Sequence, residues 1–538
     1  MKKFSLVFIW TFVILSIVTF AESCHTVATM PSNKLTKKGR VVVVHKNRLV
    51  LHTLKDSLNQ DELDTLSALS DSDSIASALD SIALDSLNKD TLVKVPLPQR
   101  LAALMDRFEK DYPTAEIGFA AYDLTADSLI YGYQNKKLYR PASTQKVLTA
   151  VAALDQLGPS YKFETRLYRT GAVVKGTLQG DLYVVGSLDP EFDNADMNML
   201  ADAVARQGIE RIEGHVIGDV SMKDSLYWGS GWVWDDTPQD FQPYLTPLMF
   251  SKGYVSVTAT PATNGRSAVL HVRPESSFYQ VVNQTTSRSS GSNSFSITRN
   301  WIGGGNQIVA TGNVTSPVTK TVNIIHTPDF FMSTFLERLK AKKIEADSCS
   351  YGEYSGEGEL IASTSHSLEQ VMRRALKKSD NLSAEAMFYN LGAKRSGSKY
   401  IGTKESIGAI SAQMVKAGLN PRDYRIADGS GVSLYNYTTA DAEVQMLKYA
   451  YKQPTYTIFY SALPIAGIDG TLRSRMKGTL ARDNVHAKTG TVTGISSLAG
   501  YITTSDGHQV AFAIICTGVL RARIGRIIQD KLCVAMAE

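Results

Sequence analysis

A serine and a lysine three residues apart can place an amine beside a hydroxyl, and this chain repeats that S-x-x-K spacing. The pattern begins at Ser86, Ser143, Ser396 and Ser474. Only the second of these runs directly into an apolar segment, residues 147–152, that predicts a buried helix. Residues three apart share a helix face, so we expect the Lys146 amine beside the Ser143 hydroxyl, where it can activate a nucleophile. The competing interpretation is a helix-capping serine followed by a surface lysine.

A second motif, Ser379-Asp380-Asn381, adds a hydroxyl and an amide that can bind or protonate a substrate. The pattern S-x-N also occurs at Ser57 and Ser86, so it is weak by itself. Its competing interpretation is a cap for a predicted helix over 382–389, with Ser379 serving as a capping residue.

A third motif, Lys488-Thr489-Gly490, is the only K-T-G in the chain. Its surroundings predict an edge strand, on which a glycine permits close approach of a ligand backbone. The competing interpretation is a β-turn.

The order of these three motifs narrows the chemistry. The motifs S-x-x-K, S-x-N and K-T-G, in this order along the chain, are typical of serine acyl-transfer enzymes that act on penicillin or on peptides ending in D-Ala-D-Ala. The chain contains neither the H-E-x-x-H pattern of zinc peptidases nor the G-x-S-x-G of hydrolase nucleophile elbows. The nine histidines are scattered. The sequence therefore predicts an enzyme without a metal or other cofactor.

The spacing of the motifs resembles one family within that class. The first and second motif serines are 236 residues apart, which indicates a long insertion. With an insertion at this position, the chain resembles the class C low-molecular-mass penicillin-binding proteins, which are D-alanyl-D-alanine carboxypeptidase/endopeptidases. The segments 230–237 (SGWVWDDT), 428–431 (DGSG) and 463–475 (LPIAGIDGTLRSR) are similar to family segments, and the likeness runs from about residue 97 to the end.

The resemblance implies roles for five catalytic residues. Ser143 would attack the peptide carbonyl, and Lys146 would be its base, with a pKa lowered by burial and by a nearby Lys488. Ser379 would relay a proton to the departing amino group, and Asn381 would hydrogen-bond a substrate amide.

The resemblance also implies substrate-binding groups. Lys488 and Thr489 would bind the terminal carboxylate of the substrate. The backbone N–H groups of Ser143 and Thr491 would form the oxyanion hole, beside Gly490. Asp219 resembles a family aspartate that would meet a side-chain amine of the stem peptide, and its competing interpretation is a turn former.

These roles predict a carboxypeptidase that acts on peptidoglycan stem peptides. They also predict endopeptidase activity on cross-bridges and inhibition by β-lactams. Two rival functions are a β-lactamase, for which we identify no deacylating glutamate, and an envelope-tethered scaffold with an inactive site. The net charge of +5 from 57 basic and 52 acidic residues gives no indication of nucleic-acid binding.

The helices and strands expected around the three motifs indicate an α/β (α+β) serine β-lactamase/transpeptidase-like fold, in which helices flank an antiparallel sheet. We expect helices over 97–112, 147–157 and 520–536, and strands over 117–124, 129–133, 498–503 and 509–516. The transpeptidase-like domain would comprise residues 96–168 and 364–538. Residues 169–363 would form an inserted β-rich region of two small subdomains.

The N-terminal region predicts export to the bacterial cell envelope or periplasm. Residues 1–23 have the basic start, apolar run and small residues of a signal peptide. Cleavage before Cys24 with lipid on its thiol would make a lipoprotein; ordinary cleavage and a retained anchor are the alternatives. Contact with a membrane is expected only through that lipid or anchor. Residues 24–95 include an acidic Leu-Ser-Asp repeat that predicts a disordered tether, or alternatively a weak amphipathic helix.

Overall fold

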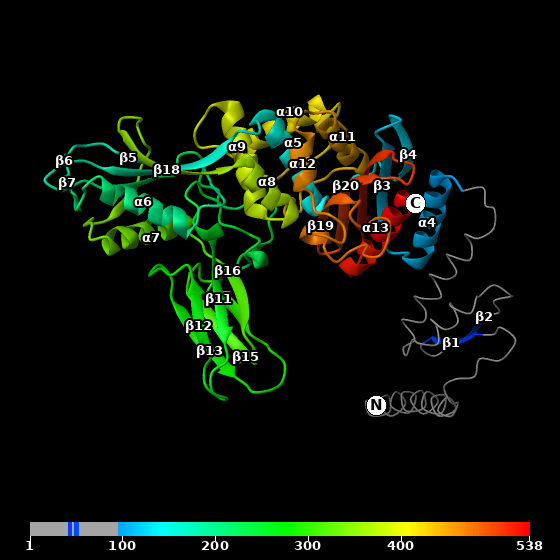
Figure 1. Ribbon diagram of the computed structural model, residues 1–538, viewed down its shortest axis with the longest axis horizontal. Helices are drawn as coiled ribbons and strands as arrows, with labels where there is room; N and C mark the ends of the chain where they lie inside the picture. Colours follow the sequence, from blue (N-terminus) through cyan, green and yellow to red (C-terminus); the bar gives the residue numbers. More distant parts are fainter. Residues whose placement is uncertain (1–40, 46–47, 53–94) are drawn as a thin grey trace, which may run out of the picture. The chain divides into compact units, whose positions relative to one another are not determined.

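The computed structural model describes residues 41–45, 48–52 and 95–538, which belong to two compact units, Met1–Val95 and Pro96–Glu538 (Figure 1). Within the first unit, strands β1 (Val41–His45) and β2 (Arg48–His52) pair antiparallel. The predicted signal peptide, Cys24 and most of the predicted tether lie outside the described residues. Among the helices that are described, none is long and apolar enough to cross a membrane.

A five-stranded antiparallel sheet organises the second unit, in the order β19-β20-β21-β3-β4. Its strands come from both ends of the chain, as the sequence predicts. The strands are β3 (Glu116–Asp123), β4 (Ser128–Tyr133), β19 (His486–Val492), β20 (Ile495–Thr503) and β21 (Gln509–Thr517). Strand β19, which carries the K-T-G motif, is the edge strand that the motif's surroundings predict.

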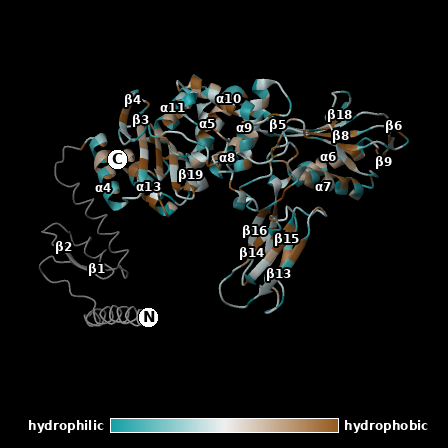
Figure 2. Ribbon diagram, turned by 180° about the vertical axis from the view of Figure 1, so that it is seen from behind, coloured by the Kyte–Doolittle hydropathy of each residue, from teal (hydrophilic) through white to brown (hydrophobic). Residues whose placement is uncertain are grey.

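Helices cover both faces of this sheet, because its side chains alternate between two apolar cores. Phe119, Phe512 and Ile514 face one core, together with helices α4 (Leu97–Asp111) and α13 (Ala522–Ala537). Ala120 and Ala513, next to these residues in sequence, face the other core. That core contains α5 (Gln145–Gln156), α8 (Leu368–Lys377), α9 (Asn381–Ser396), α10 (Thr403–Lys416), α11 (Ala440–Tyr451) and α12 (Tyr456–Ala462). In Figure 2, hydrophobic residues appear as brown segments on the strands of this sheet. The predicted fold class is confirmed.

The region between the first two motifs is less uniformly β than the sequence predicts. It contains a mixed five-stranded sheet, β17-β10-β8-β5-β18, and two long helices, α6 (Asn194–Arg206) and α7 (Thr327–Ala341). The strands are β5 (Lys162–Arg169), β8 (Leu182–Gly186), β10 (Val216–Asp219), β17 (Cys349–Tyr351) and β18 (Glu359–Ser367). The predicted boundary at 363 falls inside β18, which pairs with β5.

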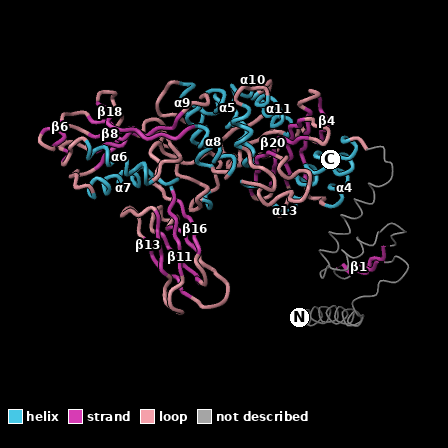
Figure 3. The backbone as a smooth tube through the Cα atoms, in the orientation of Figure 1, coloured by secondary structure: helices cyan, strands magenta, loops and turns pink. Residues whose placement is uncertain are grey.

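The strand-only part of the insertion is confined to its middle. Two three-stranded sheets, β12-β11-β16 and β13-β15-β14, lie there, and Figure 3 draws them as strands joined by loops. The strands are β11 (Tyr254–Thr260), β12 (Val269–Arg273), β13 (Val281–Ser287), β14 (Ser296–Arg299), β15 (Ile308–Val314) and β16 (Val318–Asn323). The term β-rich therefore fits residues 254–323, and the flanking parts of the insertion are mixed α/β.

Candidate active site

The first motif forms the hydroxyl–amine pair that its spacing predicts. Ser143 lies in a short 3-10 helix, η1 (Ala142–Thr144), that leads directly into α5. The Lys146 Nζ atom lies 2.9 Å from Ser143 Oγ and also donates hydrogen bonds to Asn381 Oδ1 at 2.7 Å and to the Ser430 carbonyl at 2.6 Å. A neutral amine can satisfy the two oxygen acceptors with its two hydrogens. Its lone pair is then free to face the Ser143 hydroxyl, which is the geometry a base needs.

The surroundings of Lys146 make proton loss from the amine accessible. Burial lowers its pKa to about 8, because the charged form loses solvation, although the carboxylates of Asp428, Glu385 and Asp380 act in the opposite direction. The Lys488 amine is also fully buried, and burial together with the charge of Lys146 holds its pKa well below the ordinary value. For Lys146, the effect of burial exceeds that of the three carboxylates, so burial is the main cause of its lowered pKa.

The second motif places its serine in strained backbone at the start of α9. Ser379 has a φ of 59°, a left-handed conformation that is uncommon for a residue with a side chain and is often found at functional sites. Asp380, not Ser379, caps the helix, since its Oδ1 atom accepts the Ser383 N–H at 2.7 Å. The second motif therefore does cap a helix, as its competing interpretation expects, but the capping residue is Asp380 and the assignment of this role to Ser379 is wrong. The Asn381 amide donates to the Phe241 carbonyl at 2.6 Å, while its oxygen accepts from Lys146.

The third motif brings a second amine to a second hydroxyl. The Lys488 Nζ atom donates to Ser379 Oγ at 2.8 Å and to the Thr489 carbonyl at 2.5 Å. The Thr489 hydroxyl donates to Thr471 Oγ1 at 2.8 Å, and Thr491 lies exposed on the same edge strand. The five residues predicted to be catalytic thus form two hydroxyl–amine pairs, joined through the turn that carries Ser379 and Asn381.

Gly490 allows the edge strand to pack tightly against the nucleophile. A Cβ atom at this position would lie 2.0 Å from Ser497 Oγ, 2.8 Å from the Pro141 carbonyl and 3.0 Å from the Ser143 nitrogen. The Ser497 hydroxyl already donates to the Pro141 carbonyl at 2.5 Å, so it has little freedom to move away. The glycine therefore keeps β19 within reach of η1.

We expect Gly490→Ala to lower the rate of acylation by a penicillin by roughly 10²-fold, because β19 must shift away from Ser143. The rate of covalent labelling and the melting temperature should both be measured. Gly408→Ala is the matched control, since Gly408 lies in α10 with only the Arg395 Nε atom 4.0 Å from the added Cβ. The control should label at the wild-type rate and melt slightly higher, because alanine favours a helix by about 1 kcal/mol over glycine. Equal labelling by Gly490→Ala would contradict the packing argument.

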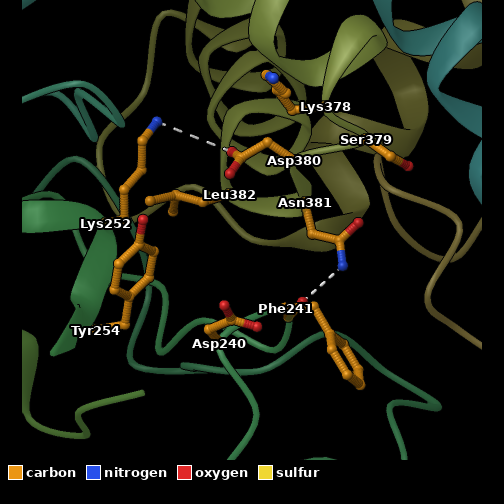
Figure 4. A pocket seen from close by; sticks show the side chains of 9 residues that line it. All are labelled: Asp240, Phe241, Lys252, Tyr254, Lys378, Ser379, Asp380, Asn381 and Leu382. Carbon is orange, nitrogen blue, oxygen red and sulfur yellow. Dashed lines mark hydrogen bonds and ion pairs between the residues drawn. The ribbon is translucent and has the colours of Figure 1, made fainter. Parts of the chain in front are cut away.

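A pocket of about 180 Å³ opens beside the second motif (Figure 4). Ser379 and Asn381 line one side of it, and Lys252, Tyr254 and Phe241 from the insertion line the other. Lys252 lies 4.0 Å from the Asp380 carboxylate, as the dashed line in Figure 4 indicates. The insertion therefore contributes a wall of the site.

Asp219 lies at the end of β10 and is held by its own surroundings. Its side chain is 3% exposed, with Oδ1 accepting the Ser221 N–H at 2.8 Å and Oδ2 accepting the Tyr354 N–H at 2.9 Å. Asp219 is not among the residues that line the pocket beside the second motif. The geometry of Asp219 is that of the turn former considered as its competing interpretation, and recognition of a substrate amine by this residue stays a prediction.

Sequence reasoning missed a buried carboxyl group next to the nucleophile. Glu443 on α11 is fully buried, and its Oε1 atom lies 2.5 Å from Thr144 Oγ1, which in turn lies 2.9 Å from the Pro141 carbonyl. A protonated Glu443 can donate to Thr144, which leaves the hydroxyl free to donate to Pro141. Burial raises the Glu443 pKa to about 8, in keeping with a neutral carboxyl.

We expect Glu443→Gln to flatten the pH dependence of stability. The folded chain binds this proton more tightly than the unfolded chain, whose glutamate pKa is near 4.5. Its contribution is therefore complete below about pH 4.5 and is lost as the pH rises through about 8, by an amount on the order of 2–4 kcal/mol. Chemical denaturation at pH 5 and pH 8.5 measures this loss. The control Glu369→Gln, an exposed position on α8, should retain the wild-type slope, and so would Glu443→Gln if the carboxyl ionised normally.

No group of three or more histidine, cysteine, aspartate or glutamate side chains that could hold a metal ion occurs among residues 41–45, 48–52 and 95–538.

Known proteins resemble this chain in sequence and in fold over most of its length. A D-alanyl-D-alanine carboxypeptidase of Actinomadura sp. (strain R39) is 28% identical over 446 residues, covering 78% of this chain and 81% of that protein. The D-alanyl-D-alanine carboxypeptidase DacB of Haemophilus influenzae is 28% identical over 417 residues, covering 75% and 86%. The crystal structure of penicillin binding protein 4 (dacB) from Haemophilus influenzae superposes with a TM-score of 0.70 at 24% identity, covering 80% and 99%.

The resemblance inferred from the three motifs is confirmed by a match to a whole family rather than to single relatives. The sequence profile of the D-Ala-D-Ala carboxypeptidase 3 (S13) family matches residues 99–538, which include all three motifs and the insertion between them. This chain belongs to the D-Ala-D-Ala carboxypeptidase 3 (S13) family.

Proposed function

We propose that the protein is a serine D-Ala-D-Ala carboxypeptidase that acts on peptidoglycan stem peptides through an acyl-enzyme on Ser143. The observation that carries the proposal is the contact between the Lys146 amine and the Ser143 hydroxyl at 2.9 Å, with the Ser379–Lys488 pair held against them through Asn381. Family membership supports the same reaction.

In the acylation step, the proton of the Ser143 hydroxyl passes to Lys146 Nζ as the oxygen attacks the carbonyl carbon of the penultimate D-Ala. The negative charge that forms on the carbonyl oxygen would be stabilised by the N–H groups of Ser143 and Thr491. When the C–N bond breaks, Ser379 would relay a proton to the departing nitrogen and free D-Ala leaves. Water then attacks the ester, which releases the shortened peptide and restores the serine.

The third motif would determine which end of a peptide binds. Lys488 and Thr489 would bind the terminal carboxylate, and Gly490 and Thr491 would present edge-strand backbone to the peptide. A β-lactam carries a carboxylate and a strained amide in a similar arrangement, so it would acylate Ser143 as an inhibitor. Endopeptidase activity on cross-bridges is proposed as well, because the same attack applies to any D-Ala peptide bond that reaches the site.

Export through the N-terminal signal, and lipid attachment at Cys24, are proposed from the sequence pattern of residues 1–24. If the lipoprotein assignment is correct, a labelled fatty acid should become attached to the full-length protein and not to a Cys24→Ala variant. Labelling that persists in the variant, or never appears, would favour the alternatives of ordinary cleavage or a retained anchor.

Release of free D-alanine from a peptide ending in D-Ala-D-Ala tests the carboxypeptidase function. We expect steady release from this peptide and at least 10²-fold slower release from one ending in D-Ala-L-Ala, whose last residue has the wrong handedness for the edge strand. Nitrocefin should give one slow, stoichiometric acylation. Rapid nitrocefin turnover would favour a β-lactamase, and an absence of both reactions in folded protein would favour an inactive scaffold.

A further inference from the structure

The Ser430 carbonyl that accepts from Lys146 belongs to a turn, residues 428–431. One carboxyl group, that of Asp428, lies within the turn, and another, that of Glu385, packs against it. This turn presents its carbonyl groups to α5: Ser430 accepts from Lys146 Nζ at 2.6 Å, and Gly429 accepts from Thr149 Oγ1 at 2.7 Å. The position of the turn therefore determines where the amine of the proposed base lies.

Glu385 anchors this turn from α9. Its side chain is 1% exposed, and its Oε1 atom accepts the Ser430 N–H at 2.8 Å and the Gly429 N–H at 3.1 Å. A Cβ atom on Gly429 would lie 2.5 Å from the Phe388 Cβ atom, so the turn rests directly on the helix. Glu385 follows Asn381 by one helical turn, and α9 thus contacts Lys146 twice, directly through Asn381 and indirectly through the turn.

The two carboxyl groups at the turn differ in the number of groups that donate hydrogen bonds to them. Asp428 accepts hydrogen bonds from Gly431 N and Asn436 Nδ2 at 2.7 Å each, from Ser433 N at 2.7 Å and from Trp232 Nε1 at 2.9 Å. The two carboxylate oxygens of Asp428 are thus compensated by four donors. Glu385 has only the two turn amides, and burial, together with the charge of Asp428, raises its pKa to about 8. The Glu385 carboxyl group can therefore change charge in the pH range in which Lys146 gains or loses its proton.

We propose that Glu385 is a positioning residue for the base: it fixes the turn that orients Lys146, and its negative charge, when present, retains a proton on that amine. This inference rests on the proposed function of Lys146. Other charged or titratable groups face the pair from every side, namely Asp428, Asp380 and Lys488 around Lys146, and Asp428, Lys223 and Tyr389 around Glu385. They are unchanged when Glu385 alone is replaced.

The test is the acylation rate with a fluorescent penicillin between pH 5.5 and 9.5, for the wild type and Glu385→Gln. Without the anion, Lys146 loses its proton more easily, so the rising part of the rate profile should move to lower pH by about one unit. The highest rate should fall roughly tenfold, because the neutral glutamine oxygen accepts the two turn N–H groups more weakly than a carboxylate and the glutamine NH₂ group would face the Gly429 N–H. A lower rate with an unmoved midpoint would show that Glu385 only packs the turn, which overturns the proposal.

Thr149→Val is the matched control, since it removes the other anchor of the same turn without changing charge. It should lower the highest rate and leave the midpoint within about 0.2 pH units; a shift equal to that of Glu385→Gln would also overturn the proposal. Should Glu385→Gln fail to fold, ¹³Cε-lysine NMR of the wild type replaces it. The Lys146 resonance, identified by its loss in Lys146→Arg, should titrate in two coupled steps, and a single one-proton curve would contradict the inference. Wild-type protein that is never acylated would instead refute the proposed function.

Discussion

Replacing Ser143 with alanine is expected to abolish covalent labelling by penicillin and to reduce D-alanine release by roughly 10⁴-fold or more. The Lys146 amine lies 2.9 Å from the Ser143 hydroxyl and would then have no oxygen to activate. Intact-protein mass spectrometry after penicillin treatment should show one adduct on the wild type and none on the variant. Fold integrity is checked by the melting temperature, which should change little because only a hydroxyl is removed.

Ser396→Ala is the matched control for this experiment, because Ser396 begins another S-x-x-K sequence. It ends α9 and its hydroxyl donates to the Gly392 carbonyl at 2.9 Å, within its own helix. We expect the control to be labelled as fast as the wild type. A persistent adduct on Ser143→Ala would show that another residue is the nucleophile, and would overturn the mechanism rather than the fold.

The sequence identified Ser143 among four equivalent patterns for a physical reason. The residues that follow it are apolar on all sides, which predicts a helix buried all round, and α5 is buried from Gln145 to Leu154. A buried helix that begins with a polar pair has to place that pair in a cleft or leave it unsatisfied. Ser396 and Ser474 lack such a continuation. The edge strand of the third motif was predictable for a similar reason, from a glycine in a strand beside a second apolar strand.

Other features depend on contacts that no local pattern reports. Glu385 and Gly429 are 44 residues apart, and nothing in either segment indicates that a helix carboxylate meets the amides of a turn. The left-handed backbone of Ser379, one residue before the Asp380 cap, is likewise not specified by the order of the residues. The packed environment of Glu443 depends in the same way on the meeting of α11 with η1.

The sequence analysis does not predict the helices of the insertion, although α6 carries two helix signals. In α6, the buried residues Met197, Leu200, Ala201 and Val204 follow the helical spacing of i, i+3, i+4 and i+7. Asp193 caps the helix in a capping box with Asp196, which is a recognisable start. The glycine and threonine residues of the surrounding turns are typical of strand-rich regions, which is why the sequence predicts β structure throughout the insertion. Sequence patterns here identified the chemistry more securely than the architecture of the insertion.

Lys146→Arg is expected to lower the acylation rate by about 10³-fold or more while retaining a positive charge at the site. A guanidinium group does not lose its proton in proteins, so it cannot accept the proton of the Ser143 hydroxyl. It is also planar and longer than an ammonium, and the space between Ser143, Asn381 and Ser430 is fitted to a single nitrogen with three partners. Lys477→Arg, the exposed lysine of the S-x-x-K pattern at Ser474, is the control and should label at the wild-type rate.

The pH profile separates loss of a base from loss of a positive charge. In the wild type, the acylation rate should rise as the pH passes through the Lys146 pKa of about 8, because only the neutral amine accepts a proton. In Lys146→Arg that rise should disappear, and the small remaining rate should increase only as hydroxide does. If Lys146 acted solely as a fixed cation that stabilises the oxyanion, the arginine would preserve much of the rate and the wild-type rate would fall, not rise, above pH 8. The direction of this slope therefore distinguishes a proton acceptor from an electrostatic support.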